Sequence, residues 1–191
     1  YRELFSHPLW RRHALIGLAL AFSGIVGLWG VGFFTFDLVA NVLRGKFTAD
    51  GMTGKQLDGA VGHWKGIASL TMNLGAAFGM YGFAILAQRM GRKPTFAVCF
   101  LAALVSTATT FSSLREFHQV FWMVPIMGFC ILSLFAGYAI YFPELFPTHL
   151  RSAGTSFCYN VGRFVAAVGP LFTGMLIKFY ADVAKTADTA A

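Results

Sequence analysis

Charged residues are scarce in this sequence. Asp, Glu, Lys and Arg make up 12% of its 191 residues, whereas a soluble domain of this length carries about 25%. Hydrophobic residues make up 57%, so too few polar residues remain to build a soluble shell around them. This composition excludes an ordinary soluble domain and indicates that lipid surrounds much of the protein.

Cysteine is also rare, and its placement excludes two kinds of site. Cys99, Cys130 and Cys158 each stand alone inside an apolar run. Their spacing matches no metal-binding motif, and it does not predict a disulfide framework. We therefore expect no metal and no other cofactor.

A basic stripe with interleaved aromatic residues, which would indicate nucleic-acid binding, does not occur outside the apolar runs. The formal net charge is nevertheless +7. Lysines and arginines in loops beside a membrane give such a charge because they face anionic lipid. The expected partner is a lipid bilayer rather than a nucleic acid.

Long apolar runs dominate what is present. Each has about 20 or more mostly apolar residues, the length that a membrane helix needs. The predicted spans are residues 14–40, 67–87, 95–114, 120–142 and 153–180. The fold class is therefore all-α transmembrane, with a half-domain over 14–180, a cytoplasmic linker end at 1–13, a loop at about 41–66 and an extracytoplasmic tail at 181–191.

The orientation of these spans follows from their flanking cations. A raw count gives seven lysines and arginines on each side. The turn at 88–94 packs three of them together, and the opposite side mixes its cations with acidic residues in a longer loop and in the tail. We expect the 88–94 side to be cytoplasmic, in a multi-pass protein of the inner (plasma) membrane.

Polar and small residues inside the spans offer binding or packing surfaces. Gly75, Gly79 and Gly82 repeat at helical spacing and predict close contact with another helix. Asn73 and Tyr81 share a different face, where they either hydrogen-bond a solute or join helices. Two further interpretations concern aromatic residues: Trp29, among glycines, lines a cavity or packs, and Tyr138 and Tyr141 anchor at the interface.

Two short polar turns lie on the predicted cytoplasmic side. One contains Arg89 and Arg92, and the other contains Glu144 and Arg151. Glu144 can pair with any of these three arginines. A surface ion pair contributes little stability, which suits a latch that must open, and simple charge anchoring of the helix ends is the alternative.

The two turns resemble those of the second half of a major facilitator superfamily transporter. GFAILAQRMGRKP at 82–94 is similar to the loop between its eighth and ninth helices, and PELFPTHLRSAG at 143–154 to the loop between its tenth and eleventh. The spacing of Arg151, Arg163 and Pro170 resembles the organic ion and aromatic acid–proton symporter branches, while YNVG at 159–162 is similar to sialic acid and sugar carriers. The resemblance implies helices seven to eleven of an incomplete six-helix half-bundle. The first half-bundle and the twelfth helix are then expected elsewhere in a longer protein.

Arg163 stands well inside the fifth predicted span. If that helix enters the membrane near Ala153, Arg163 lies roughly 15 Å deeper, about half of a ~30 Å hydrocarbon core. A charge there costs at least ~2.5–3.5 kcal/mol, and no acidic residue lies inside the spans except Asp37 at the outer end of the first. Three interpretations stay open: Arg163 binds an anionic solute, pairs with an acid elsewhere in the protein, or lies nearer the inner interface.

Around Arg163 the sequence predicts a candidate site. Asn160 shares its helical face, and Pro170 bends the helix and frees the Ala166 carbonyl. We expect a secondary active transporter of a small organic solute. Arg163 indicates an organic anion, and the resemblance to the symporter branches implies that a proton is carried with it. The alternatives are a sugar or polyol carrier, with Asn73 and Asn160 as hydroxyl partners, and a drug efflux carrier. A membrane-embedded enzyme or a channel would need converging ionisable groups or a filter segment that these spans lack.

Overall fold

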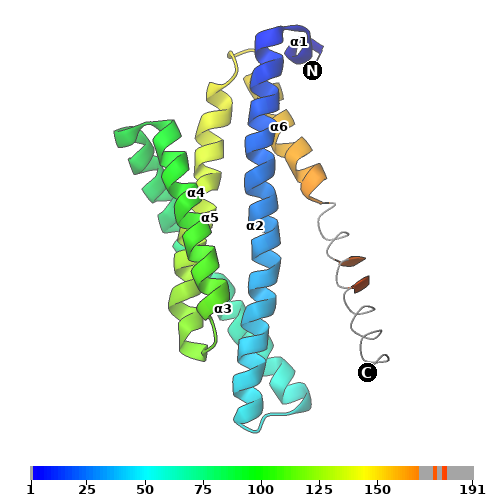
Figure 1. Cartoon of the computed structure of the whole chain (residues 1–191), viewed down its shortest axis with the longest axis vertical. Helices are drawn as coiled ribbons and strands as arrows, with labels where there is room; N and C mark the ends of the chain where they lie inside the picture. Colours follow the sequence, from blue (N-terminus) through cyan, green and yellow to red (C-terminus); the bar gives the residue numbers. More distant parts are fainter. Residues whose placement is uncertain (1, 168–173, 176–177, 180–191) are drawn as a thin grey trace. The chain divides into compact units, whose positions relative to one another are not determined.

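The computed structural model describes residues 2–167, 174–175 and 178–179, and these contain helices and no strand. The helices are α1 (Arg2–Ser6), α2 (Pro8–Ala49), α3 (Gly54–Met90), α4 (Arg92–Ser113), α5 (Phe117–Glu144) and α6 (Arg151–Ala166) (Figure 1). The chain divides into two compact units. Unit 1 comprises residues 1–30 and 145–191, and unit 2 comprises residues 31–144.

Four of these helices, α2 to α5, are long and apolar enough to cross a membrane. The prediction of an all-α transmembrane fold is therefore confirmed. The fifth predicted span begins with α6, which extends over 16 residues. Residues 168–173 of that span, including Pro170, and residues 176–177 and 180 lie outside the described residues.

Unit 2 is built on the packing of α3 against α5. A Cβ added at Gly75 would meet the backbone of Pro125, and one added at Gly79 would meet the backbone of Phe129. On the other helix, a Cβ at Gly128 would meet the carbonyl oxygen of Met72. The two backbones thus touch through glycine, as small residues in membrane helices allow, and the predicted contact face of α3 is confirmed.

Two aromatic clusters hold the helices of unit 2 together near their ends. The Trp64 cluster comprises Phe47, Trp64, Phe117 and Phe121, with ring centroids of neighbouring rings 5.0–6.0 Å apart. The Tyr138 cluster comprises Phe83, Phe96, Tyr138 and Phe142, with centroids 5.1–5.6 Å apart. Offset and edge-to-face rings at these distances stabilise a core beyond the area that they bury.

Tyr138 corrects one prediction from the sequence. It was expected to anchor α5 at the membrane interface, but its side chain is fully buried and stacks on Phe142. The helix face decides this, because Tyr138 lies one turn from Leu134 and Phe142 on the buried side of α5. Hydropathy alone does not distinguish a buried tyrosine from an interfacial one.

Unit 1 joins the first part of α2 to α6. A Cβ at Gly17 would lie 2.7 Å from Sγ of Cys158, and a Cβ at Gly162 would lie 3.0 Å from Cδ1 of Ile25. The ring of His13 hydrogen-bonds through Nδ1 to the carbonyl oxygen of Leu145, at 2.9 Å. The start of α2 is therefore tied both to α6 and to the turn that precedes it.

The helices are longer than the predicted spans. The prediction of a loop at about 41–66 is wrong, because α2 and α3 continue through these residues and leave only residues 50–53 between them. Gly51 and Gly54 make that turn with φ of +84° and +58°, a conformation that glycine adopts at low cost. Residues 1–13, predicted as a linker, are helical from Arg2 to Ser6 and again from Pro8.

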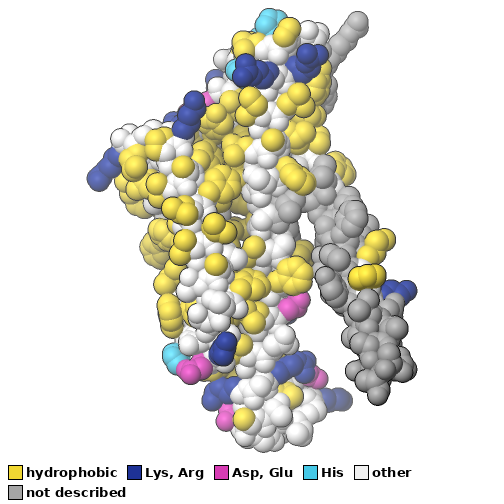
Figure 2. Space-filling view, viewed as in Figure 1, with side chains coloured by type: hydrophobic (Ala, Val, Ile, Leu, Met, Phe, Trp, Pro, Cys, Tyr) yellow, Lys and Arg dark blue, Asp and Glu magenta, His cyan; other side chains and the backbone are white. Residues whose placement is uncertain are grey.

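The helices extend beyond the predicted spans because a fall in hydropathy marks the edge of the membrane rather than the end of a helix. The 42 residues of α2 extend about 63 Å, twice the ~30 Å of a hydrocarbon core. Figure 2 shows the consequence in unit 2, where charged side chains gather near the ends of the helices and hydrophobic side chains cover much of their length. The polar ends of α2 and α3 are helical segments that extend beyond the predicted spans.

Candidate functional site

In unit 2, the turn between α3 and α4 and the end of α5 place a charged pair where the sequence predicted one. Arg92 is the first residue of α4, directly after Gly91, whose φ is +86°. Its Nη2 donates to Oε1 of Glu144 at 2.7 Å, and its Nε donates to Oε2 at 3.1 Å. This two-pronged arrangement is the geometry in which a guanidinium fits a carboxylate best.

Glu144 lies beyond the predicted span 120–142, at the end of a helix of 28 residues that is about 42 Å long. The hydrogen bonds from Arg92, and to a lesser extent its positive charge, hold the pKa of the Glu144 carboxyl below its usual value. Both side chains are partly exposed, at 33% for Arg92 and 46% for Glu144. The pair is therefore ionised at neutral pH and accessible to competing water and salt.

Arg89 and Arg151 were the other predicted partners of Glu144. Both are exposed, and Arg89 forms no ion pair with a described residue of unit 2, whereas Arg151 belongs to unit 1. Arg89 lies in the last turn of α3, and Arg151 is the first residue of α6. Within unit 2 the geometry therefore selects Arg92 rather than Arg89, and a pair with Arg151 stays a prediction.

On α6, Asn160 and Arg163 lie on the face that does not pack against α2. The packed face carries Gly154, Cys158 and Gly162, which are buried, whereas Asn160 and Arg163 are exposed. Nδ2 of Asn160 donates to Oγ of Ser156 at 3.0 Å. The predicted pair of polar side chains therefore shares one open helical face.

The surroundings of Arg163 within unit 1 supply an aromatic ring rather than a carboxylate. Its Cζ lies 5.8 Å from the centroid of the Tyr159 ring, a cation–π distance. No ion pair joins Arg163 to an acidic residue in the described part of the chain. Its five N–H donors can therefore meet an acceptor that comes from outside these residues.

The remaining predicted site residues have separate positions. Asn73 and Tyr81 are both exposed on α3, in unit 2, and the Asn73 amide donates to the carbonyl oxygen of Ser69 at 2.8 Å. Trp29 lies within α2, but its side chain is outside the described part of the structure, as is Pro170. The contribution of these two residues stays a prediction.

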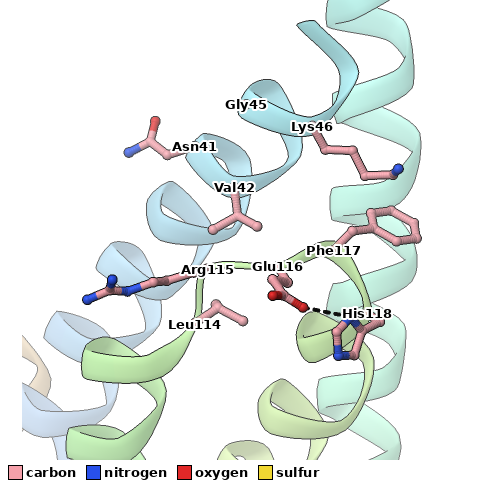
Figure 3. Close-up of a pocket in the computed structure, with 9 residues that line it drawn as sticks. All are labelled: Asn41, Val42, Gly45, Lys46, Leu114, Arg115, Glu116, Phe117 and His118. Atoms are coloured by element: carbon pink, nitrogen blue, oxygen red, sulfur yellow. Dashed lines mark ion pairs between the residues drawn. The ribbon is translucent and has the colours of Figure 1, made fainter. Parts of the chain in front are cut away.

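A groove at the other end of unit 2 was not predicted. It has a volume of about 740 Å³ and lies between the end of α2 and the turn from α4 to α5 (Figure 3). Its lining residues are Asn41, Val42, Gly45, Lys46, Leu114, Arg115, Glu116, Phe117 and His118. One signal in the sequence could have indicated the turn beside it, because Gln119 follows Glu116 by three residues. Oε1 of Gln119 accepts the backbone N–H groups of Arg115 and Glu116 at 2.8 and 3.0 Å, which fixes the turn.

Comparison of the sequence with known families finds a match. The sugar (and other) transporter family matches residues 18–173, most of the chain. The chain belongs to this family. The family lies in the major facilitator superfamily, so the resemblance seen in the two turns is confirmed. The chain is accordingly an integral, multi-pass membrane protein.

Three proteins that are similar to this chain have names that refer to transport. A Haemophilus influenzae protein named for metabolite transport is 29% identical over 106 residues, which cover 56% of this chain and 26% of that protein. A Cupriavidus pinatubonensis protein named for 4-methylmuconolactone transport is 31% identical over 112 residues (52% and 24%). The inner membrane metabolite transport protein YdjE of Escherichia coli is 27% identical over 115 residues (58% and 24%).

The matched segments span about a quarter of the length of these relatives. No solved structure gives a significant match to the chain. Within the described residues, no three His, Cys, Asp or Glu side chains gather in a group that could hold a metal ion.

Proposed function

We propose that this chain is part of a secondary active carrier that moves a small organic anion across the membrane by alternating access. Its membership of the sugar (and other) transporter family and the names of its relatives support the carrier function. In this proposal the chain supplies one bundle of a rocking pair, and the solute lies between the two bundles. The inner membrane is the proposed location, as the positive charge around 88–94 suggests.

The exposed face of α6 carries the proposal of an anionic solute. A guanidinium that faced lipid at mid-membrane depth would cost at least ~2.5–3.5 kcal/mol, so the face with Arg163 is expected to border a polar space. Arg163 and Asn160 together offer charged and neutral donors there. A carboxylate matches this set because its two oxygens accept a guanidinium fork, and the amide beside it can orient the rest of the solute.

Proton coupling is the finer part of the proposal and rests on the resemblance to aromatic acid–proton symporters. A carboxylate that crosses with a proton moves without net charge transfer. An inward proton gradient would then drive accumulation even at zero membrane potential. A uniporter would only equilibrate the solute.

The test uses the complete polypeptide that contains this chain, reconstituted in proteoliposomes. Benzoate uptake is measured with and without an imposed pH gradient, with the potential clamped by potassium and valinomycin, and glucose is the second solute. Gradient-dependent accumulation of benzoate is the expected result. Glucose accumulation without benzoate uptake would instead favour the sugar carrier, in which Asn73 and Asn160 bind hydroxyl groups. Uptake of neither solute above empty liposomes would contradict both forms of the proposal.

A further inference from the structure

The groove between α2 and the α4–α5 turn has an uneven charge distribution. Lys46 lies 3.4 Å from the Asp50 carboxylate and 5.6 Å from the centroid of the Phe117 ring, so nearby groups already balance its charge. Glu116 and His118 form a second pair, with Oε2 and Nδ1 3.2 Å apart. Arg115 is the groove cation that no acidic side chain of the described residues neutralises.

Arg115 and Asn41 project toward the same side of the groove in Figure 3, whereas Glu116 turns toward His118. One side of the groove therefore presents a guanidinium and a primary amide, and its carboxylate lies on the other side. Val42 and Leu114 supply apolar surface between α2 and the turn. A flat organic carboxylate matches this combination of an anion-binding side and an apolar wall.

The position of the groove relates such binding to the entry of a solute. Arg115 follows the end of α4, and Arg92 begins that helix, so the groove and the Arg92–Glu144 pair lie at opposite ends of 22 helical residues, about 33 Å apart. If the pair faces the cytoplasm, the groove faces the side from which a solute enters. A cation in a partly enclosed groove raises the local concentration of anions by focusing its field.

We propose that this groove is a second, outer site that binds the carboxylate of the transported solute through Arg115 and Asn41 before it reaches the membrane interior. The inference rests on the proposed function, since it assumes an organic anion as the solute. The phosphate of an anionic lipid shares the same chemistry, and the experiment separates the two sources. Direct binding predicts that benzoate occupies the groove even when transport is blocked.

Gly45 provides a reporter position in the complete polypeptide. It lines the groove, and a Cβ added there meets no atom within 4 Å, so Gly45→Cys leaves Arg115 and Asn41 in place. The rates at which an anionic and a cationic methanethiosulfonate label this cysteine give the local potential. The protein without the new cysteine corrects for Cys130, since Cys99 and Cys158 are buried.

Arg115→Gln is expected to lower the anionic-to-cationic rate ratio about fivefold at about 0.1 M ionic strength, because one charge acts on both reagents at short range. Lys93→Gln removes the same charge from the other end of α4 and is expected to leave the ratio unchanged, since it lies about three Debye lengths away at that ionic strength. Benzoate is expected to slow labelling, and this protection should disappear in Arg115→Gln.

The measurement is made in nanodiscs of phosphatidylcholine alone and with phosphatidylglycerol. Protection by benzoate in phosphatidylcholine supports the proposal. If phosphatidylglycerol slows the labelling and benzoate does not, the proposal is overturned in favour of a lipid site. Equal rate ratios in Arg115→Gln and Lys93→Gln overturn it altogether. Because labelling needs no transport, a failed outer site is distinguished from a failed carrier, which appears as absent benzoate uptake by the unsubstituted protein.

Discussion

Gly79 determines how closely α3 approaches α5. A methyl group at this position would run into the backbone of Phe129, which cannot move aside as a flexible side chain can. Gly79→Ala is therefore expected to lower the free energy of unfolding by about 1–3 kcal/mol, as overpacking of a tight interface does. Unfolding followed by circular dichroism in detergent micelles measures the change.

Gly59→Ala is the matched control for that substitution. Gly59 lies in the same helix, is exposed, and a Cβ added there meets no atom within 4 Å. Alanine should stabilise the helix at this position by roughly 0.5–1 kcal/mol, because it loses less backbone entropy on folding. Equal effects of the two substitutions would show that α3 and α5 do not meet through glycine.

The sequence predicted the glycine face of α3 but not its partner. Spacing at i, i+4 and i+7 identifies a face within one helix, so Gly75 and Gly79 were found. Their contacts at Pro125 and Phe129 depend on which face of α5 turns toward α3, and the near-uniform hydrophobicity of α5 hides that face. The same ambiguity explains why Tyr138 was predicted at the membrane interface although it is buried.

At the scale of the element, α6 is fixed to α2 by a close contact between Gly17 and Cys158. A methyl group at Gly17 would lie 2.7 Å from Sγ but 3.8 Å from Cβ of Cys158. Gly17→Ala should therefore destabilise the protein by about 1–3 kcal/mol, and Cys158→Ala should restore most of that loss in the double variant. Melting temperatures of both single variants and the double variant give the coupling. Additive losses would mean that this contact does not limit the α2–α6 distance.

The turn that joins α3 to α4 is held to the end of α5 by a pair whose effect depends on pH. Because the folded-state pKa of Glu144 is lowered, the pair stabilises the fold above the unfolded pKa of about 4.3 and loses this effect as pH falls through the folded pKa. The melting temperatures of the unsubstituted protein and Glu144→Gln should differ slightly at pH 7 and converge toward pH 3.

Arg92→Gln should reproduce the pH profile of Glu144→Gln, and the double variant should show no further loss, since each substitution removes the same pair. A difference between the unsubstituted protein and Glu144→Gln that stays constant from pH 7 to pH 3 would contradict the account. Faster or slower benzoate uptake in either variant at neutral pH would indicate that the pair also acts as a latch. Unchanged uptake would indicate that the pair only anchors the helix ends.

Helix ends were the least predictable elements. The predicted spans 14–40, 67–87 and 120–142 lie within α2, α3 and α5, but α2 and α3 extend through residues that were expected to form a long loop. Amphipathic or polar sequence can continue a helix into water once its apolar part is fixed, so a fall in hydropathy does not predict a helix end. In the structure, glycines with positive φ lie at these turns, namely Gly51, Gly54 and Gly91, but nearby glycines such as Gly59 and Gly62 are helical, so glycine alone does not predict a helix end.

For the whole molecule, fold class and family were predictable because both depend on patterns within single segments: the length of the apolar runs, and two turns that resemble those of a known superfamily. The groove at Arg115 was not, because it joins residues 41–46 to residues 114–118. The candidate site on α6 was predictable in part. Its residues were found from the sequence, and the structure adds that Asn160 and Arg163 share the face left open by packing on α2.

The most direct test of the central claim compares benzoate with benzamide, its neutral counterpart, in proteoliposomes that contain the complete polypeptide. Arg163→Gln should lower kcat/KM for benzoate at least about thirtyfold, since a desolvated charge pair contributes about 2 kcal/mol or more. It should change any benzamide uptake little. Arg12→Gln removes an exposed arginine from the first part of α2 and serves as the control. Benzoate uptake that is the same in Arg163→Gln and Arg12→Gln would contradict the claim that α6 binds the anion.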